Sequence, residues 1–253
     1  ENSAVLHKRQ ELRFLLMTLA ASEPSLRYTQ GMCSIGRFIL EIVRAGQAGS
    51  ATAPLSPHQM AAAFNLFSAM LRTGSASTHT PCDARPPSAT LPGLAPLFSR
   101  DMTALRCRLY QADRLIRRRM PTLASHLAHE GIESSSFASS FILTLGSNFT
   151  CFPAPLVAQL WDGWCIGGWP AVFNSLLSML AALQPRLLRA PMEDVLQYLS
   201  APLALSNLFD DVPSFSPGHA GCSAVGDAVT TAELNALETD FWCNAQANVS
   251  GRL

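Results

Sequence analysis

The sequence contains little charge and no long hydrophobic run. Only 14% of its residues are charged, and 18 Lys and Arg balance 18 Asp and Glu, so the net charge is zero. Such a chain has no global positive charge to attract nucleic acid, and we expect no nucleic-acid partner. A bilayer span needs about 20 apolar residues. Because the stretches 141–145 and 172–183 are too short or too interrupted, we predict no transmembrane helix. The charged residues 1–13 also lack the apolar core of a signal peptide.

The sequence also lacks the patterns of disulfide, metal and nucleotide sites. Its seven cysteines are scattered and form no CxxC pair, which favours free thiols in a reducing compartment over a disulfide framework or a zinc site. His126 and His129 have no further ligands near them in the sequence, so we expect no metal there. Neither a phosphate-binding GxxxxGKS or GxxxxGKT loop nor a GxSxG elbow occurs. We therefore expect a cytoplasmic protein that has no cofactor and binds no nucleotide itself.

Apolar residues recur at helical spacing along most of the chain, and the alternating runs and hairpin turns of β-strands are nearly absent. We therefore predict an all-α fold. The expected helices cover residues 12–22, 31–42, 60–71, 104–120, 123–128 (as a continuation of the preceding helix), 137–145, 155–161, 172–187, 192–199 and 231–245. Small residues and prolines predict a linker at 46–57 and a flexible loop at about 74–92. The chain after Pro202 is expected to be mixed and partly loop-like.

The segment Tyr28-Thr29-Gln30-Gly31-Met32 places a glutamine between two apolar helical stretches. A glutamine amide can accept a hydrogen bond from water and donate another, and a glutamine in this setting can orient the attacking water in phosphoryl transfer. The alternative is that Tyr28 and Gln30 only cap the start of a helix. Taken by itself, this segment leaves both interpretations open.

Four ordered segments resemble the TBC domain, the catalytic module of Rab GTPase-activating proteins. They are Tyr28 to Met32 (YxQGM), Leu91 to Leu94 (LPGL), Phe141 to Leu145 (FILTL), and Leu160-Trp161-Asp162 with Gly168-Trp169. Cys33 departs from the family, which often has asparagine after QGM. The resemblance implies an all-α, multi-helix, V-shaped domain that grips a Rab small GTPase. We expect residues 1–253 to form a single TBC-like domain that lacks its extreme N-terminal part.

The resemblance also implies which residues act. In that family a glutamine of the YxQ motif and an arginine of an IxxDxxR motif enter the nucleotide site of the Rab together. Gln30 would be the catalytic glutamine, supported by Tyr28, Gly31 and Met32. No IxxDxxR motif occurs in the sequence, so the arginine either lies upstream of it or is absent from this member. Arg27, next to Tyr28, is the best of the remaining cations near the glutamine.

We therefore expect a GTPase-activating protein that accelerates GTP hydrolysis by a Rab in vesicle trafficking. The partner would hold GTP and Mg²⁺, and this chain would supply the glutamine in trans. The alternative is a catalytically weak or silent Rab-binding or scaffold module, which the missing arginine motif favours. In either role, we expect that the protein can be recruited to membranes as a peripheral protein.

Two further features have structural and functional interpretations. The stretch 106–119 contains six arginines: Arg106, Arg108, Arg114, Arg117, Arg118 and Arg119. They predict either a solvated helix face or a surface for an acidic partner or anionic lipid headgroups. An apolar core is expected from five aromatic residues: Phe149, Phe152, Trp161, Trp164 and Trp169. Asp162 lies between two apolar runs, where a buried carboxylate would need a partner.

Overall fold

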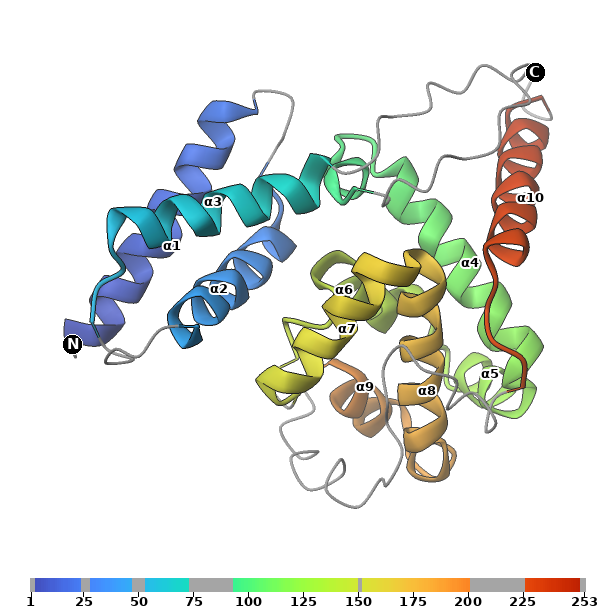
Figure 1. Ribbon diagram of the computed structural model, residues 1–253. Coiled ribbons are helices and arrows are strands. Elements are labelled where there is room, and N and C mark those ends of the chain that lie inside the picture. The colour runs from blue at the N-terminus through green and yellow to red at the C-terminus, as the bar shows by residue number, and fades with distance from the viewer. Residues whose placement is uncertain are drawn as a thin grey trace. The chain divides into compact units, whose positions relative to one another are not determined.

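The computed structural model describes residues 3–23, 28–46, 53–72, 93–149, 152–200 and 226–250. Every regular element within these residues is a helix, which confirms the predicted all-α fold (Figure 1). The chain forms two compact units, Glu1–Thr103 and Ala104–Leu253. The loop predicted at 74–92 and the stretch 201–225 lie outside the described residues. The single domain and the V shape that the resemblance implies stay predictions.

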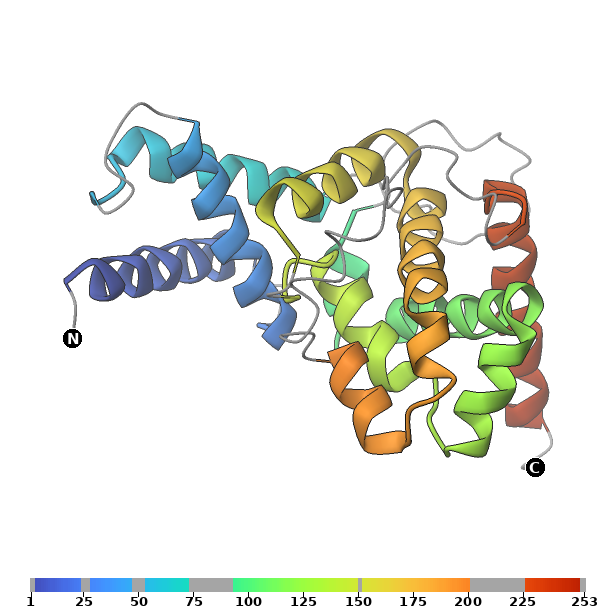
Figure 2. The same ribbon diagram turned by 90° about the horizontal axis from the view of Figure 1, so that it is seen from below.

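The first unit is built from α1 (Ser3–Ser22), α2 (Gln30–Ala45), α3 (Pro57–Arg72) and the short 3-10 helix η1 (Ala95–Phe98). The three α-helices pack against one another (Figures 1 and 2). Each contributes fully buried side chains: Leu15 and Leu19 from α1, Ile35 and Ile39 from α2, and Phe67 from α3. The apolar spacing of the sequence therefore predicted all three helices, although α1 begins at Ser3 rather than near Leu12.

The second unit contains seven helices within the described residues: α4 (Thr103–Arg119, whose first residue closes the first unit), α5 (Pro121–His129), α6 (Ser135–Thr144), α7 (Ala154–Gly167), α8 (Trp169–Leu187), α9 (Met192–Ser200) and α10 (Thr231–Ser250). Helix α8 is its central element, because α6, α7 and α10 all contact it. Its buried residues Val172, Leu176, Leu180, Leu183 and Leu187 recur at intervals of three or four, which is the spacing of one helix face.

The helix predicted to continue through 123–128 is instead interrupted. Helix α4 ends at Arg119, α5 begins at Pro121, and Met120 between them has φ −133° and ψ 57°. Proline lacks a backbone N–H, and its ring disfavours the α conformation in the residue before it. Pro121 is therefore unsuited to a helix interior but well suited to the first position of a new helix.

The predicted aromatic core is confirmed. All of its residues are at least nine-tenths buried: Phe149, Phe152, Trp161, Trp164 and Trp169. The prediction that Asp162 is buried among them is wrong, because this side chain is exposed on α7. An exposed carboxylate is solvated by water and needs no partner from the protein.

Among the described helices, none combines the length and the hydropathy needed to cross a bilayer. The described residues also bring together no group of three or more His, Cys, Asp or Glu that could hold a metal ion. The imidazole Nε2 of His126 lies 3.2 Å from the carbonyl oxygen of Ala190, and His129 is exposed.

Candidate catalytic site

Gln30 is the first residue of α2. Thr29, immediately before it, is extended (φ −127°, ψ 146°) and is the N-cap of the helix. The Thr29 carbonyl accepts a hydrogen bond from the Met32 N–H at 2.9 Å, and the Thr29 N–H donates to the Met32 sulfur at 3.4 Å. Thr29 and Met32 therefore fix the point where the extended chain becomes helix. The side chain of Gln30 and the whole of Arg27 lie outside the described residues, so their roles stay predictions.

Tyr28 contacts a cysteine that follows the motif. Its ring is 61% exposed, and its hydroxyl oxygen lies 2.7 Å from the sulfur of Cys33. This hydrogen bond is the main reason why the pKa of Tyr28 is raised above its usual value, and burial adds to the effect. The phenol therefore stays protonated at neutral pH. The structure thus shows that Tyr28 contacts Cys33, the position that departs from the family pattern, and its expected support of Gln30 stays a prediction.

Gly31 and Met32 are buried, with Met32 only 3% exposed. They pack beneath the start of α2, and their support of a site at Gln30 stays a prediction. One turn further along, α2 approaches its neighbours closely at Gly36. A Cβ atom there would lie 2.9 Å from Leu12 Cδ1 of α1 and 3.4 Å from Phe67 Cε1 of α3. The missing side chain of Gly36 is what lets these three helices pack so tightly.

The other end of α2 is held by a buried ion pair. Arg44 forms a charge-assisted hydrogen bond with Glu11 of α1, and their side chains are only 11% and 10% exposed. The second carboxylate oxygen of Glu11 accepts the backbone N–H of Leu55 at 2.7 Å, just before α3. One carboxylate thus joins α1, α2 and the segment that leads into α3.

This ion pair was not predicted, although the sequence contains a signal for it. Glu11 is followed by Leu15 and Leu19 at i+4 and i+8, so an acidic residue lies in line with two buried leucines. A carboxylate on a buried face needs a cation or hydrogen-bond donors. Together with the packing at Gly36, the pair makes α2 a rigid support for the glutamine at its first residue.

In the second unit, two of the recognised motifs form one packed turn. The chain leaves α6 through Leu145, which has the left-handed conformation (φ 46°, ψ 46°), and Gly146 (φ 75°). The indole N–H of Trp161 donates to the Leu145 carbonyl at 3.0 Å. A Cβ atom on Gly146 would lie 2.9 Å from Leu160 Cδ2. The FILTL and LWD segments therefore stabilise the junction of α6 and α7.

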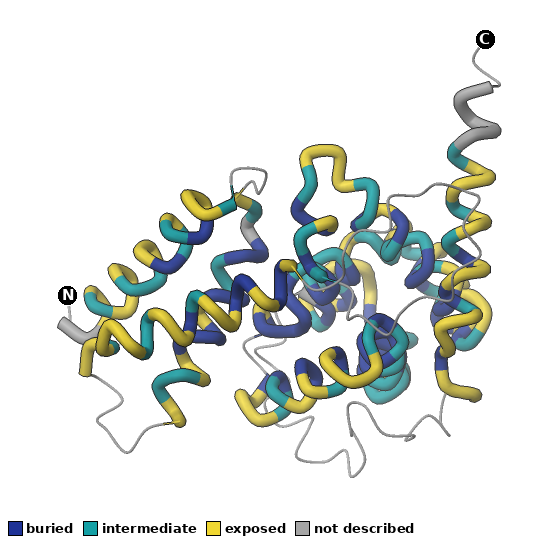
Figure 3. The backbone as a smooth tube through the Cα atoms, turned by 45° about the horizontal axis from the view of Figure 1, so that its top comes forward, coloured by how far each residue is buried: buried dark blue, intermediate teal, exposed yellow. Residues whose placement is uncertain are grey.

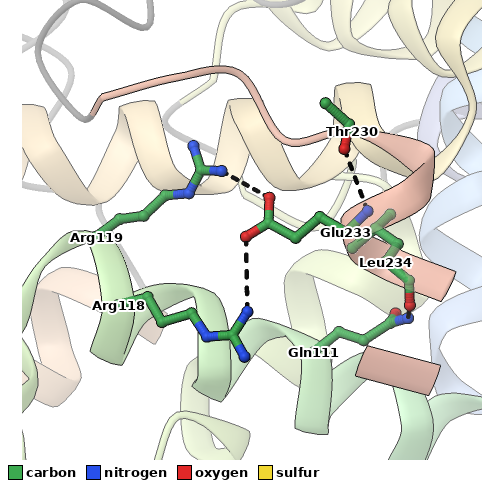
Figure 4. A network of polar contacts seen from close by, with 6 residues as sticks. All are labelled: Gln111, Arg118, Arg119, Thr230, Glu233 and Leu234. Carbon is green, nitrogen blue, oxygen red and sulfur yellow. Dashed lines mark hydrogen bonds and ion pairs between the residues drawn. The ribbon is translucent and has the colours of Figure 1, made fainter. Parts of the chain in front are cut away.

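The arginine-rich helix α4 is largely paired within its own unit. Arg119 Nη2 lies 2.7 Å from Glu233 of α10, Arg118 lies 3.9 Å from the same carboxylate, and the fully buried Gln111 amide donates to the Leu234 carbonyl at 2.8 Å (Figure 4). Arg118 and Arg119 were predicted to be solvated or to bind a partner, and they are instead paired at the contact between α4 and α10.

Arg108 of α4 is paired as well, between two other helices. Its guanidinium stacks over the ring of Trp169 of α8, with 4.9 Å from Cζ to the ring centroid, and lies 3.8 Å from Glu238 of α10. Burial lowers the pKa of Arg108 below its usual value, but a guanidinium remains charged at any physiological pH. The GW motif at Gly168-Trp169 thus provides an aromatic surface for a buried cation.

Residues 91–216, about half of the chain, match the RabGAP TBC domain family. The chain belongs to the RabGAP TBC family. Among the relatives of this TBC protein, GTPase activating protein Gyp51 of Schizosaccharomyces pombe is 34% identical over 110 residues, which cover 44% of this chain and 10% of that protein. The Ecotropic viral integration site 5 protein homolog of Homo sapiens is 31% identical over 120 residues, 47% of this chain and 14% of that protein. GTPase-activating protein GYP5 of Eremothecium gossypii is 24% identical over 223 residues, 87% of this chain and 23% of that protein.

The resemblance to TBC domains is therefore confirmed. The chain spans between a tenth and a quarter of the length of these three relatives. The family match contains the LPGL, FILTL, LWD and GW segments, and the Tyr28–Met32 segment lies before its first residue. The matched motifs within the second unit are those that pack its helices together, whereas the candidate catalytic glutamine belongs to the first unit.

Proposed function

We propose that this TBC protein is a GTPase-activating protein for a Rab small GTPase and that Gln30 orients the attacking water. The observation that carries the proposal is the position of Gln30 at the first residue of a firmly anchored α2, in a chain of the RabGAP TBC family. Hydrolysis of GTP requires a water molecule placed in line with the γ-phosphate. Because an amide accepts and donates hydrogen bonds at once, a glutamine is suited to this task.

In the proposed reaction, the Rab binds the nucleotide and Mg²⁺. This chain would contribute the water-orienting amide, and its rate enhancement depends on whether an arginine acts with it. An arginine supplied to the transition state is worth about 10³ to 10⁵ in rate, or roughly 4–7 kcal/mol of activation free energy. With Gln30 alone, we expect a weak activator.

The test is single-turnover GTP hydrolysis by a panel of Rab proteins, with the wild-type chain and with Gln30→Ala. We expect the variant to lose about 10²-fold or more of the acceleration, the scale typical of a positioned transition-state hydrogen bond. Gln197→Ala is the matched control, because Gln197 is an exposed glutamine of α9 in the second unit. Full acceleration by Gln30→Ala would refute the role of the glutamine.

A second candidate function is a Rab-binding module without catalysis. The specific observation in its favour is that no IxxDxxR motif occurs in residues 1–253. This function predicts capture of a GTP-loaded Rab with no change in its hydrolysis rate, for both the wild type and Gln30→Ala. Failure to bind any Rab in either nucleotide state would exclude this function and the first.

A further inference from the structure

The chain enters α2 through a side-chain contact that spans the first turn of the helix. Thr29 is the N-cap, so Tyr28 occupies the position before the cap and Cys33 the fourth helical position. Residues at these two positions often pack against each other, and their contact fixes the angle at which the chain enters the helix. In this protein the contact is a hydrogen bond of 2.7 Å between the Tyr28 hydroxyl and the Cys33 sulfur. The thiol therefore holds Tyr28 against the first turn of α2.

The two residues that lead into α2 are held in different ways. The Thr29 N–H donates to the sulfur of Met32 at 3.4 Å, and Met32 is itself fixed by burial, with only 3% of it exposed. Tyr28 is 61% exposed, so packing holds its ring only weakly. The hydrogen bond with Cys33 therefore does most to fix Tyr28, two residues before Gln30.

The body of α2 does not depend on this contact. Residues 31–40 are mostly buried, which Figure 3 shows as dark blue along the tube, and the far end of the helix carries the ion pair between Arg44 and Glu11. Gln30, the first helical residue, lies between the contact and this buried body. Loss of the contact should therefore change the entry into α2, and with it the backbone of Gln30, without unfolding the helix.

We propose that Cys33 is a positioning residue for the catalytic glutamine: by holding Tyr28 across the first turn of α2, it fixes the backbone that presents Gln30. The inference rests on the proposed function, because Gln30 needs a fixed position only if it orients water. A small displacement of a group that acts in the transition state is costly in rate. A side chain that keeps the hydrogen bond should therefore replace Cys33, and one that cannot form it should not.

The experiment is single-turnover GTP hydrolysis by the Rab that responds best to the wild-type chain, measured over a range of chain concentrations. Cys33→Ala and Tyr28→Phe each remove the hydrogen bond. We expect each to lower the rate at saturation about 2- to 10-fold, the range that one net hydrogen bond represents, with an unchanged half-saturating concentration. Cys33→Ser keeps a hydrogen-bonding group and should retain most of the rate. Tyr28→Phe/Cys33→Ala should lose no more than either single variant, because both substitutions remove the same contact.

A titration reports the contact without catalysis. The hydrogen bond with Cys33 is the main cause of the raised pKa of Tyr28, so Cys33→Ala should return this pKa toward 10.0. NMR titration of the tyrosine rings measures the change, and the Tyr28 signal is identified by its loss in Tyr28→Phe. An unchanged pKa of Tyr28 in Cys33→Ala would overturn the proposal.

Cys243→Ala is the matched control, because Cys243 is an exposed free cysteine of α10 in the second unit. It should change neither the rate nor the pKa of Tyr28, and circular dichroism should show that all variants remain folded. Full acceleration by Cys33→Ala, with acceleration lost in Gln30→Ala, would overturn the role of Cys33 and leave the proposed function intact. Losses that add in the double variant would also overturn it. If the wild type accelerates no Rab, the proposed function fails, and the role of Cys33 fails with it.

Discussion

The ion pair between Arg44 and Glu11 should be the most sensitive polar contact of the first unit. Replacing Arg44 with Met keeps most of the side-chain length and removes the charge. The carboxylate of Glu11, with its side chain only 10% exposed, then keeps the Leu55 N–H but loses its cation. Breaking a buried pair from one side costs about 3–5 kcal/mol. Because one donor remains, we expect Arg44→Met to lower the free energy of unfolding by about 2–3 kcal/mol.

The assay is urea denaturation followed by circular dichroism, with a thermal scan beside it. A loss of this size lowers the melting temperature by roughly 4–12 °C in a chain of this length. The loss of stability should be smaller when the unpaired carboxylate of Glu11 is also removed. We therefore expect Glu11→Gln/Arg44→Met to be more stable than Arg44→Met alone by at least about 1 kcal/mol. Amide hydrogen exchange should place the loss in α2 and its neighbours.

The first unit contains a second ion pair that serves as a control. Arg72 lies 2.6 Å from Glu23, but the two side chains are 58% and 31% exposed. A pair in contact with water contributes about 0–1 kcal/mol, so Arg72→Met should be nearly neutral. The reasoning is refuted if Arg44→Met is as mild as Arg72→Met, or if the effects of the Glu11 and Arg44 substitutions simply add within about 0.5 kcal/mol.

Two further predictions concern the second unit. Gly146→Ala should destabilise it by about 1–3 kcal/mol, because Gly146 has φ 75° and a Cβ there would lie 2.9 Å from Leu160 Cδ2; a urea midpoint equal to that of the wild type would contradict this. Burial raises the pKa of the Cys107 thiol to about 11 from 9.0 in the unfolded chain. A raised native pKa favours the protonated form, so this share of the stability is complete below pH 9 and is lost as pH rises through about 11. Urea midpoints measured across this range should fall more steeply for the wild type than for Cys107→Ala, and parallel curves would contradict the effect.

Much of the fold could be predicted because helix formation leaves a local signal. In α8, buried residues recur every three or four positions, and this pattern is visible without knowing what the helix packs against. The break at Met120 was just as local, since Pro121 marks it, but the apolar residues on both sides concealed it. The exposure of Asp162 could not be inferred in this way, because its apolar neighbours in the sequence face the core while it faces water.

The candidate site was likewise only partly predictable from the sequence. The motif around Gln30 and the family of the chain are properties of residue order, and the sequence alone determined them together with the helical class. The ion pairs that hold the helices together join residues far apart in the sequence. In the first unit, Arg44 and Glu11 are 33 positions apart, and in the second unit Arg119 and Glu233 are 114 positions apart. The sequence around a charged residue does not indicate its ion-pair partner, because a solvated arginine and a paired one occupy the same positions in a helical pattern. Only the tertiary structure could therefore show that Arg108, Arg118 and Arg119 of α4 pair with carboxylates of α10, whereas Arg117 pairs with Asp113 of its own helix.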